Sequence, residues 1–213
     1  MIIDMHMHEM RYSGDSFLRL ENMVEIAKHR GLDGICITDH DSMGLKEFAA
    51  EYSEKTGFPI FVGIEFYSLQ GDIVAFGIED YPKERIPAQE FVDLVQAQGG
   101  MCFSAHPFRN NNRGLEENLK IVKGLDGIEV LNGSTLYEAN RKAAEYAAEL
   151  GLATVGSSDC HVPEKLGIYA TYFPREIRSV QELIRSVKRC ETLPVYYRSE
   201  EHTSELQSRG HLV

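Results

Sequence analysis

The sequence predicts a single α/β domain in which strands and helices alternate. Three observations support this: short apolar runs recur along the chain, segments with apolar residues at helical spacing separate them, and Gly or Pro marks most boundaries. Strands that alternate with helices of this length favour a parallel sheet. About seven such units fit into residues 1–197, which favours a small closed or distorted barrel over an open sheet.

The predicted strands are short apolar runs bounded by turn residues. In chain order they cover residues 2–6, 33–38, 60–66, 72–78, 101–105, 127–131, 153–156 and 169–173. A turn at Gln70-Gly71 separates the third and fourth strands. We therefore expect these two strands to form a hairpin.

The predicted helices carry apolar residues three or four positions apart. In chain order they cover residues 18–30, 42–55, 87–98, 115–123, 135–150 and 180–189. Gly31 ends the first, Ser42 can cap the second, and Pro87 lies in the first turn of the third. The helix over residues 135–150, rich in Ala and Glu and closed by Gly151, has the strongest pattern.

Composition and charge exclude several classes of protein. With 43% hydrophobic and 26% charged residues, the chain is neither disordered, collagen-like nor a coiled coil. No apolar run approaches the ~20 residues that span a bilayer. The net charge of -11 argues against stable nucleic-acid or membrane binding. Four cysteines without a C-x-x-C pair, and no signal peptide before the first strand, favour a cytoplasmic location.

The end of the chain differs from everything before it. Residues 198–213 are polar, lack strand or helix periodicity, and resemble the translation of a sequencing-adapter oligonucleotide. We therefore expect residues 1–197 to form the functional domain and residues 198–213 to be a non-native, disordered tail.

Residue types that bind metal ions gather after the predicted strands. Five of the six histidines in residues 1–197 do so: His6, His8, His40, His106 and His161. Other polar residues with the same placement are Glu65, Glu129, Asn132 and Asp159. The carboxyl ends of parallel barrel strands form one face, so these side chains should converge. Because they exceed the three or four ligands of one zinc ion, a multinuclear site is predicted.

The sequence resembles the PHP (polymerase and histidinol phosphatase) family. The resemblance covers residues 1 to about 190 and rests on motifs that occur in the family's order: Asp4-Met-His6-Met-His8, Thr38-Asp39-His40-Asp41, Gly63-Ile-Glu65, Ala105-His106-Pro107-Phe-Arg109, Glu129-Val-Leu-Asn132 and Ser158-Asp159-Cys-His161. It implies a distorted seven-stranded β/α barrel. It also implies two to three divalent metal ions, for which Mn, Zn and Fe are the candidates.

The resemblance also assigns the candidate ligands. The first ion would be held by His6, His8, Glu65 and Asp159. Glu65 would bridge to a second ion, completed by His106 and Asn132. A third ion would be held by Asp15, His40 and His161. Two positions depart from the pattern, because Asp15 lies in a turn-like Gly-Asp-Ser loop and Asn132 stands where some members carry His.

Such a site implies a metal-dependent phosphoesterase that uses a metal-bridging hydroxide. Arg109 is the candidate phosphate clamp, with a surface ion pair as its simpler explanation. His161 or His40 could protonate the leaving group. The expected substrate is a small phosphomonoester, a nucleotide or a short oligonucleotide, so phosphatase and exonuclease both stay open, as does the oligomeric state.

Two other functions compete with this one. An amidohydrolase-type enzyme would cleave C–N bonds on a similar barrel, but no predicted strand ends in the Lys that such enzymes carbamylate. A non-catalytic regulatory PHP module would show lost ligands, whereas this ligand set is nearly complete.

Overall fold

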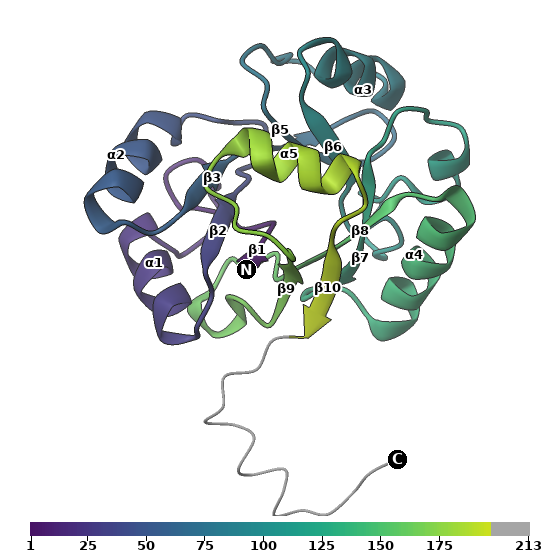
Figure 1. The fold of residues 1–213 in the computed structure, drawn as a ribbon. Helices are drawn as coiled ribbons and strands as arrows, with labels where there is room; N and C mark the ends of the chain where they lie inside the picture. The colour runs from purple at the N-terminus through teal and green to yellow at the C-terminus, as the bar shows by residue number, and fades with distance from the viewer. Residues whose placement is uncertain (197–213) are drawn as a thin grey trace, which may run out of the picture.

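Two five-stranded sheets form the centre of the computed structural model, which describes residues 1–196 (Figure 1). The first sheet has the order β10-β9-β1-β2-β3. Its strands are β1 (Ile2–Asp4), β2 (Gly34–Ile37), β3 (Ile60–Val62), β9 (Tyr169–Tyr172) and β10 (Leu193–Tyr196). The second sheet follows the chain from β4 to β8. Its strands are β4 (Ile64–Tyr67), β5 (Asp72–Phe76), β6 (Met101–Ser104), β7 (Gly127–Asn132) and β8 (Ala153–Ser157).

Strand directions are mixed in both sheets. Strands β1, β2 and β3 are parallel to one another, and so are β6, β7 and β8. Strand β5 pairs antiparallel with both β4 and β6, which confirms the predicted hairpin. Strand β9 runs antiparallel to β1 and β10. The parallel pairs need long crossover connections, and most of these contain helices.

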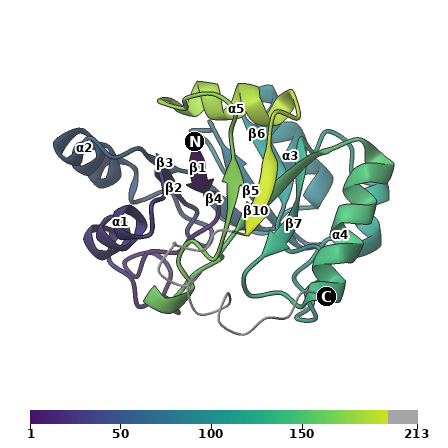
Figure 2. The ribbon, with the colours of Figure 1, turned by 60° about the horizontal axis from the view of Figure 1, so that its bottom comes forward.

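Within residues 1–196, five α-helices surround the sheets. They are α1 (Leu20–His29), α2 (Lys46–Thr56), α3 (Ala88–Ala97), α4 (Tyr137–Leu150) and α5 (Val180–Lys188). The first four lie around the outside, whereas α5 crosses the end of the sheets at which β1 begins (Figure 2). Its buried residues Leu183, Ile184 and Val187 join a core cluster that includes Phe76 and Met101. Helix α5 therefore closes one end, and the opposite end, where β1 points, stays accessible.

The predicted strand over residues 60–66 is interrupted at Gly63. A Cβ atom at this position would lie 2.4 Å from the carbonyl oxygen of Ala75, so only glycine fits. The Gly63 N–H donates to Ile37 O, while the next residues pair with β5. The chain thus passes from the first sheet into the second at this point.

The predicted seven-stranded barrel is not confirmed. Within residues 1–196 the strands number ten, they form two separate ladders, and no closed barrel is present. The cause lies in the break at Gly63, which divides one predicted strand into β3 and β4, and in the additional edge strand β10, neither of which the sequence pattern indicated. The mixed α/β class itself is confirmed.

Smaller differences have local causes. Residues 115–123 form only a 3-10 helix, Glu116–Lys120. The second helix begins at Lys46, because the Ser42 hydroxyl accepts from Gly44 N–H and closes a turn instead of capping a helix. Strand β10 contains Pro194, which is compatible with an edge strand but hides it from sequence patterns. The predicted tail over 198–213 lies outside the described residues.

Candidate metal centre

Side chains from distant parts of the chain meet in a cavity of about 250 Å³. Its lining residues are Asp15, His40, Glu65, Asp72, His106, Arg109, Asn111, Arg113, Asp159 and His161. Two single parallel bridges, Met7 with Cys160 and His40 with Glu65, bring the segments after the strands side by side. The chain therefore places the candidate residues at one end of the sheets, opposite α5.

Four side chains surround the first candidate position for an ion. The Nε2 atoms of His6 and His8 lie 3.0 Å apart, and both face the carboxylates of Glu65 and Asp159. His6 Nε2 lies 3.4 Å from Glu65 Oε1, and His8 Nε2 lies 3.2 Å from Asp159 Oδ1. Ligands about 2.1 Å from a tetrahedral ion are about 3.4 Å from one another. The spacing of these four buried side chains therefore fits a divalent cation.

Buried polar groups orient both histidines. His6 Nδ1 lies 3.3 Å from Glu129 Oε1, and Glu129 Oε2 accepts the backbone N–H of His106. His8 Nδ1 lies 3.2 Å from Ser13 Oγ, which in turn donates to Asp39. Such partners fix the ring so that the other nitrogen faces the ion. Sequence reasoning placed Glu129 near the site but missed the roles of Ser13 and Asp39.

A second group lies at the exposed mouth of the cavity. Asp15 Oδ2 lies 3.4 Å from His40 Nε2 and 3.3 Å from His161 Nε2. His8 stands between the two histidines, with its ring centroid 4.2 Å from each of theirs. The structure thus brings Asp15, His40 and His161 together, as the resemblance implies.

Around His106 the structure departs from the expected set. His106 Nε2 lies 2.9 Å from Glu65 Oε1 and 3.7 Å from Asp72 Oδ2. Asn132 stands apart from this group, because its amide bonds to Glu129, Asp159 and Arg109. Asp72 was missed because it reads as the first residue of a strand. A carboxylate directly before an apolar run is the sequence signal that could have identified it.

Arg109 reaches across the cavity. Its Nη2 donates to Asn132 Oδ1 and to Asp159 Oδ2, and its Nε donates to Thr135 Oγ1. The side chain is 19% exposed and lines the cavity. Its surface-pair alternative is wrong, since the partner Asp159 is a buried residue of the candidate centre.

Two ligand candidates have unusual backbone conformations. His106 has a φ of +28° and Asp159 a φ of +49°, in a region that side chains with a Cβ atom seldom adopt. Strain of this kind collects at functional sites, where the surrounding structure enforces it. Here the His106 N–H bond to Glu129 and the Asp159 N–H bond to His6 O hold the two residues in place.

The charges in the centre are strongly coupled. Burial lowers the pKa of His6, but the neighbouring Asp159, Glu65 and Glu129 carboxylates outweigh this and hold it well above its usual value. Burial lowers the pKa of His8 to about 4, so this ring is neutral at pH 7. For Asp159, burial raises the pKa, yet the nearby His6 and Arg109 keep it well below its usual value.

The donor set fits divalent metal ions. Four groups of three residues each place one ligand atom within 4.8 Å of the others: His8, His40 and His161; His6, His106 and Asp159; His6, His8 and Glu65; Glu65, Asp72 and His106. Glu65 Oε2 and His40 Nδ1 are buried and 2.7 Å apart, yet neither has a hydrogen bond of proper geometry. Buried polar atoms normally find partners, so these two atoms fit a site that binds a cation.

The comparisons agree with this geometry. A family model described as PHP-associated matches residues 137–192. A protein of Bifidobacterium adolescentis, provisionally described as a metal-dependent phosphoesterase, has a TM-score of 0.66 and 19% identity over 99% of this chain and 97% of its own. A lesion-specific endonuclease of Pyrococcus furiosus has a TM-score of 0.69 and 18% identity, covering 88% of this chain and 56% of its own. Residues 137–192 thus match a PHP-associated family model, and the fold of the described residues is similar to that of these solved structures.

Two further proteins are similar to this chain. An amidohydrolase of Chromobacterium violaceum has a TM-score of 0.67 and 20% identity over 93% of this chain and 99% of its own. An uncharacterized protein of Methanocaldococcus jannaschii is 28% identical over 140 residues, 61% of this chain and 80% of the relative. At these identities the solved structures establish the fold of the chain and leave its substrate open.

Other features of the protein lie apart from the centre. Cys160 is buried in an apolar cluster, which raises the pKa of its thiol and excludes it as a nucleophile.

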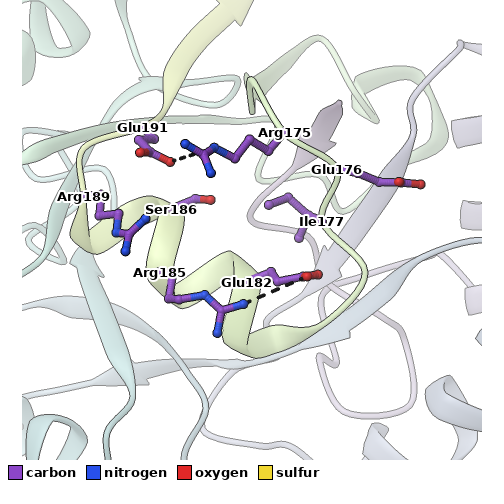
Figure 3. A pocket seen from close by; sticks show the side chains of 8 residues that line it. All are labelled: Arg175, Glu176, Ile177, Glu182, Arg185, Ser186, Arg189 and Glu191. Carbon is purple, nitrogen blue, oxygen red and sulfur yellow. Dashed lines mark ion pairs between the residues drawn. The ribbon is translucent and has the colours of Figure 1, made fainter.

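A second pocket, of about 150 Å³, lies beside α5 (Figure 3). There Arg175 faces Glu191 at 3.6 Å and Arg185 faces Glu182 at 4.0 Å. Among the described residues, no helix is both long and apolar enough to cross a membrane.

Proposed function

We propose that this protein is a metal-dependent phosphoesterase that hydrolyses a small phosphate ester, a phosphomonoester or a nucleotide. The observation that carries the proposal is the convergence of four metal-ligand triplets and Arg109 on one cavity. Divalent ions held there would neutralise the phosphate charge and make an attacking water more acidic. The likeness to PHP-family proteins supports hydrolase chemistry in general.

The distances between side-chain nitrogen and oxygen atoms indicate which residues would hold each ion. His6, His8, Glu65 and Asp159 would hold the first, Glu65 and His106 would take part in the second, and Asp15, His40 and His161 would hold the third. Manganese, zinc and iron all suit mixed nitrogen and oxygen donors. We propose two to three ions per chain.

Arg109 would bind and orient the substrate phosphate. Its guanidinium already bonds to Asn132 and Asp159, which aims it across the cavity. A planar guanidinium can offer two parallel N–H donors to two phosphate oxygens. Asn132 would then act by holding Arg109, because its Oδ1 accepts from the guanidinium.

A proton for the leaving group would come from the mouth of the cavity. His40 and His161 are each 25% exposed, and their Nε2 atoms face Asp15 on the solvent side. Either ring, when it is not occupied as a ligand, can donate a proton to an oxygen that departs there. The net charge of -11 favours small phosphoesters or short oligonucleotides over long nucleic acids.

A substrate panel tests the proposal. The full chain is loaded with Mn²⁺, Zn²⁺ or Fe²⁺ and given sugar phosphates, nucleotides, short oligonucleotides and cyclic amides. Released phosphate is expected, and it should be lost in Asp159→Asn and retained in Asp126→Asn, a carboxylate remote from the cavity. Hydrolysis of amides alone would identify an amidohydrolase. No hydrolysis with any metal would favour the regulatory module.

A further inference from the structure

We infer that Asp72, on strand β5, is a direct ligand of the ion shared by Glu65 and His106, in the place that the family resemblance gave to Asn132. This inference rests on the metal centre of the proposed function and is independent of the substrate. Three observations support it: the position of Asp72, the hydrogen bonds of Asn132, and the contacts of Arg113 that hold Asp72.

The first observation concerns the position of Asp72. Its side chain is fully buried, and its Oδ2 lies 3.7 Å from His106 Nε2. His106 Nε2 lies 2.9 Å from Glu65 Oε1. One ligand atom from each of these three residues lies within 4.8 Å of the other two. Two carboxylates and an imidazole at this spacing form a donor set for a divalent transition metal.

The second observation removes Asn132 as an alternative. Only its Oδ1 could bind a cation, and this oxygen accepts hydrogen bonds from three donors: Arg109 Nη2 at 2.6 Å, Ser134 N–H at 2.8 Å and Thr135 Oγ1 at 3.0 Å. A carbonyl oxygen has two lone pairs, and both are engaged. The amide nitrogen is a donor and repels cations. Asn132 therefore holds other residues of the cavity and has no free lone pair for an ion.

The third observation concerns how Asp72 is held. Arg113 donates to both of its oxygens, from Nε at 2.6 Å and from Nη2 at 2.9 Å. The Arg113 guanidinium stacks on the Tyr67 ring at 4.5 Å, and Arg85 covers the same ring at 3.7 Å. This arrangement fixes the plane of the carboxylate with Oδ2 toward His106. Arg113 is thus a positioning residue, of the kind that orients metal-binding carboxylates.

A purely structural Asp72–Arg113 ion pair is the simpler explanation. It accounts for the bidentate contact but not for a second buried carboxylate, Glu65, beside the same imidazole. Two carboxylates in one buried group repel each other unless a cation lies between them. The metal-ligand role explains both features at once.

Metal content provides the test. The full chain is stripped with chelator, reloaded with Mn²⁺, desalted and assayed by elemental analysis. Asp72→Asn, which keeps the shape of the side chain, should lose about one ion per chain relative to the unmodified protein. Arg113→Gln should keep the ions at saturation but weaken the last one to bind by about 10–100-fold. The matched control Asp126→Asn, a half-buried carboxylate that accepts the Cys102 N–H, should bind as the unmodified protein does. Equal ion count and affinity in Asp72→Asn would overturn the inference.

A second measurement, on the unmodified protein, tests the inference even if Asp72→Asn fails to fold. Crystals of the unmodified protein soaked in Mn²⁺ should show anomalous scattering from an ion bound by Glu65, His106 and an oxygen of Asp72. An ion bound by Glu65 and His106 with Asp72 contacting Arg113 alone would overturn the inference. A changed ion count in a protein without phosphoesterase activity would support the Asp72 assignment while contradicting the proposed function.

Discussion

The Nε2 atoms of His6 and His8 face each other at 3.0 Å in a fully buried site. Two ring nitrogens come this close when a proton or a cation lies between their lone pairs. The carboxylates of Glu65 and Asp159 face the same point and bring negative charge to it. A metal ion satisfies all four groups, whereas a single proton satisfies only one pair.

Removing ligands should lower the metal content by different amounts. Glu65 would be shared by the first and second ions, because its Oε1 lies 3.4 Å from His6 Nε2 and 2.9 Å from His106 Nε2, whereas His6 would bind the first ion alone. We expect at least two ions per chain in the unmodified protein and a larger loss in Glu65→Ala than in His6→Ala. Elemental analysis after growth in metal-rich medium measures this. One ion or fewer in the unmodified protein would contradict a multinuclear centre.

Substitution of Arg109 should separate phosphate binding from metal binding. Arg109→Lys keeps the charge but loses the bidentate geometry. Activity should fall by one to two powers of ten if the contact contributes roughly 1.5–3 kcal/mol, with the ion count unchanged. Asp159→Ala should lose more activity and also an ion. Kinetics and elemental analysis on the same samples provide the comparison, and full activity in Arg109→Lys would rule out the clamp.

Metal affinity should rise with pH. Burial lowers the pKa of His40, but the adjacent Glu65 and Asp15 carboxylates raise it to about 9 in the metal-free protein. The charged ring therefore stabilises the metal-free fold below an unfolded-state pKa of about 6.5, and this contribution is lost as the pH rises through about 9. An ion needs the neutral ring and must displace the proton.

The apparent affinity of the mouth group for Mn²⁺ should accordingly increase by up to about tenfold per pH unit between pH 6 and 8 for one displaced proton. Calorimetric titration at several pH values in buffers of different ionisation enthalpy measures both the affinity and the protons released. A flat profile without proton release would count against His40 as a ligand.

Glu129 should act on metal affinity without touching an ion. Its Oε1 faces His6 Nδ1, and its Oε2 accepts from His106 N–H. Glu129→Gln should weaken the first ion by about 10–100-fold, because the orientation and basicity of His6 change. A competition titration with a chelating dye gives the affinity. Unchanged affinity together with a lowered melting temperature would limit Glu129 to a structural role.

Gly63 should be intolerant of any side chain. A Cβ atom there would meet Ala75 O at 2.4 Å and the Phe76 ring at 2.7 Å, so the passage between the two sheets would have to shift. Gly63→Ala should cost about 1–3 kcal/mol of unfolding free energy. Gly14→Ala, with no atom within 4 Å of its Cβ, is the control. Chemical denaturation compares the two, and equal stability would contradict the packing argument.

Periodicity and spacing determined the local features of this protein. Apolar runs and glycine boundaries located most strands and helices, and histidines after strand ends indicated a metal centre, because these signals depend on neighbours within a few residues. The number of strands in each sheet depends on contacts between distant segments. The break at Gly63, the edge strand β10 and the two separate ladders were therefore visible only in three dimensions.

The same division holds within the centre. The sequence marked His6, His8 and Asp159 because each follows an apolar strand, but it could not rank Asn132 against Asp72. That choice depends on which lone pairs stay free after packing. Asn132 uses its oxygen to hold Arg109, and Arg113 turns Asp72 toward His106. Side-chain hydrogen bonds between residues more than 20 positions apart decide such roles, and only the folded chain forms them.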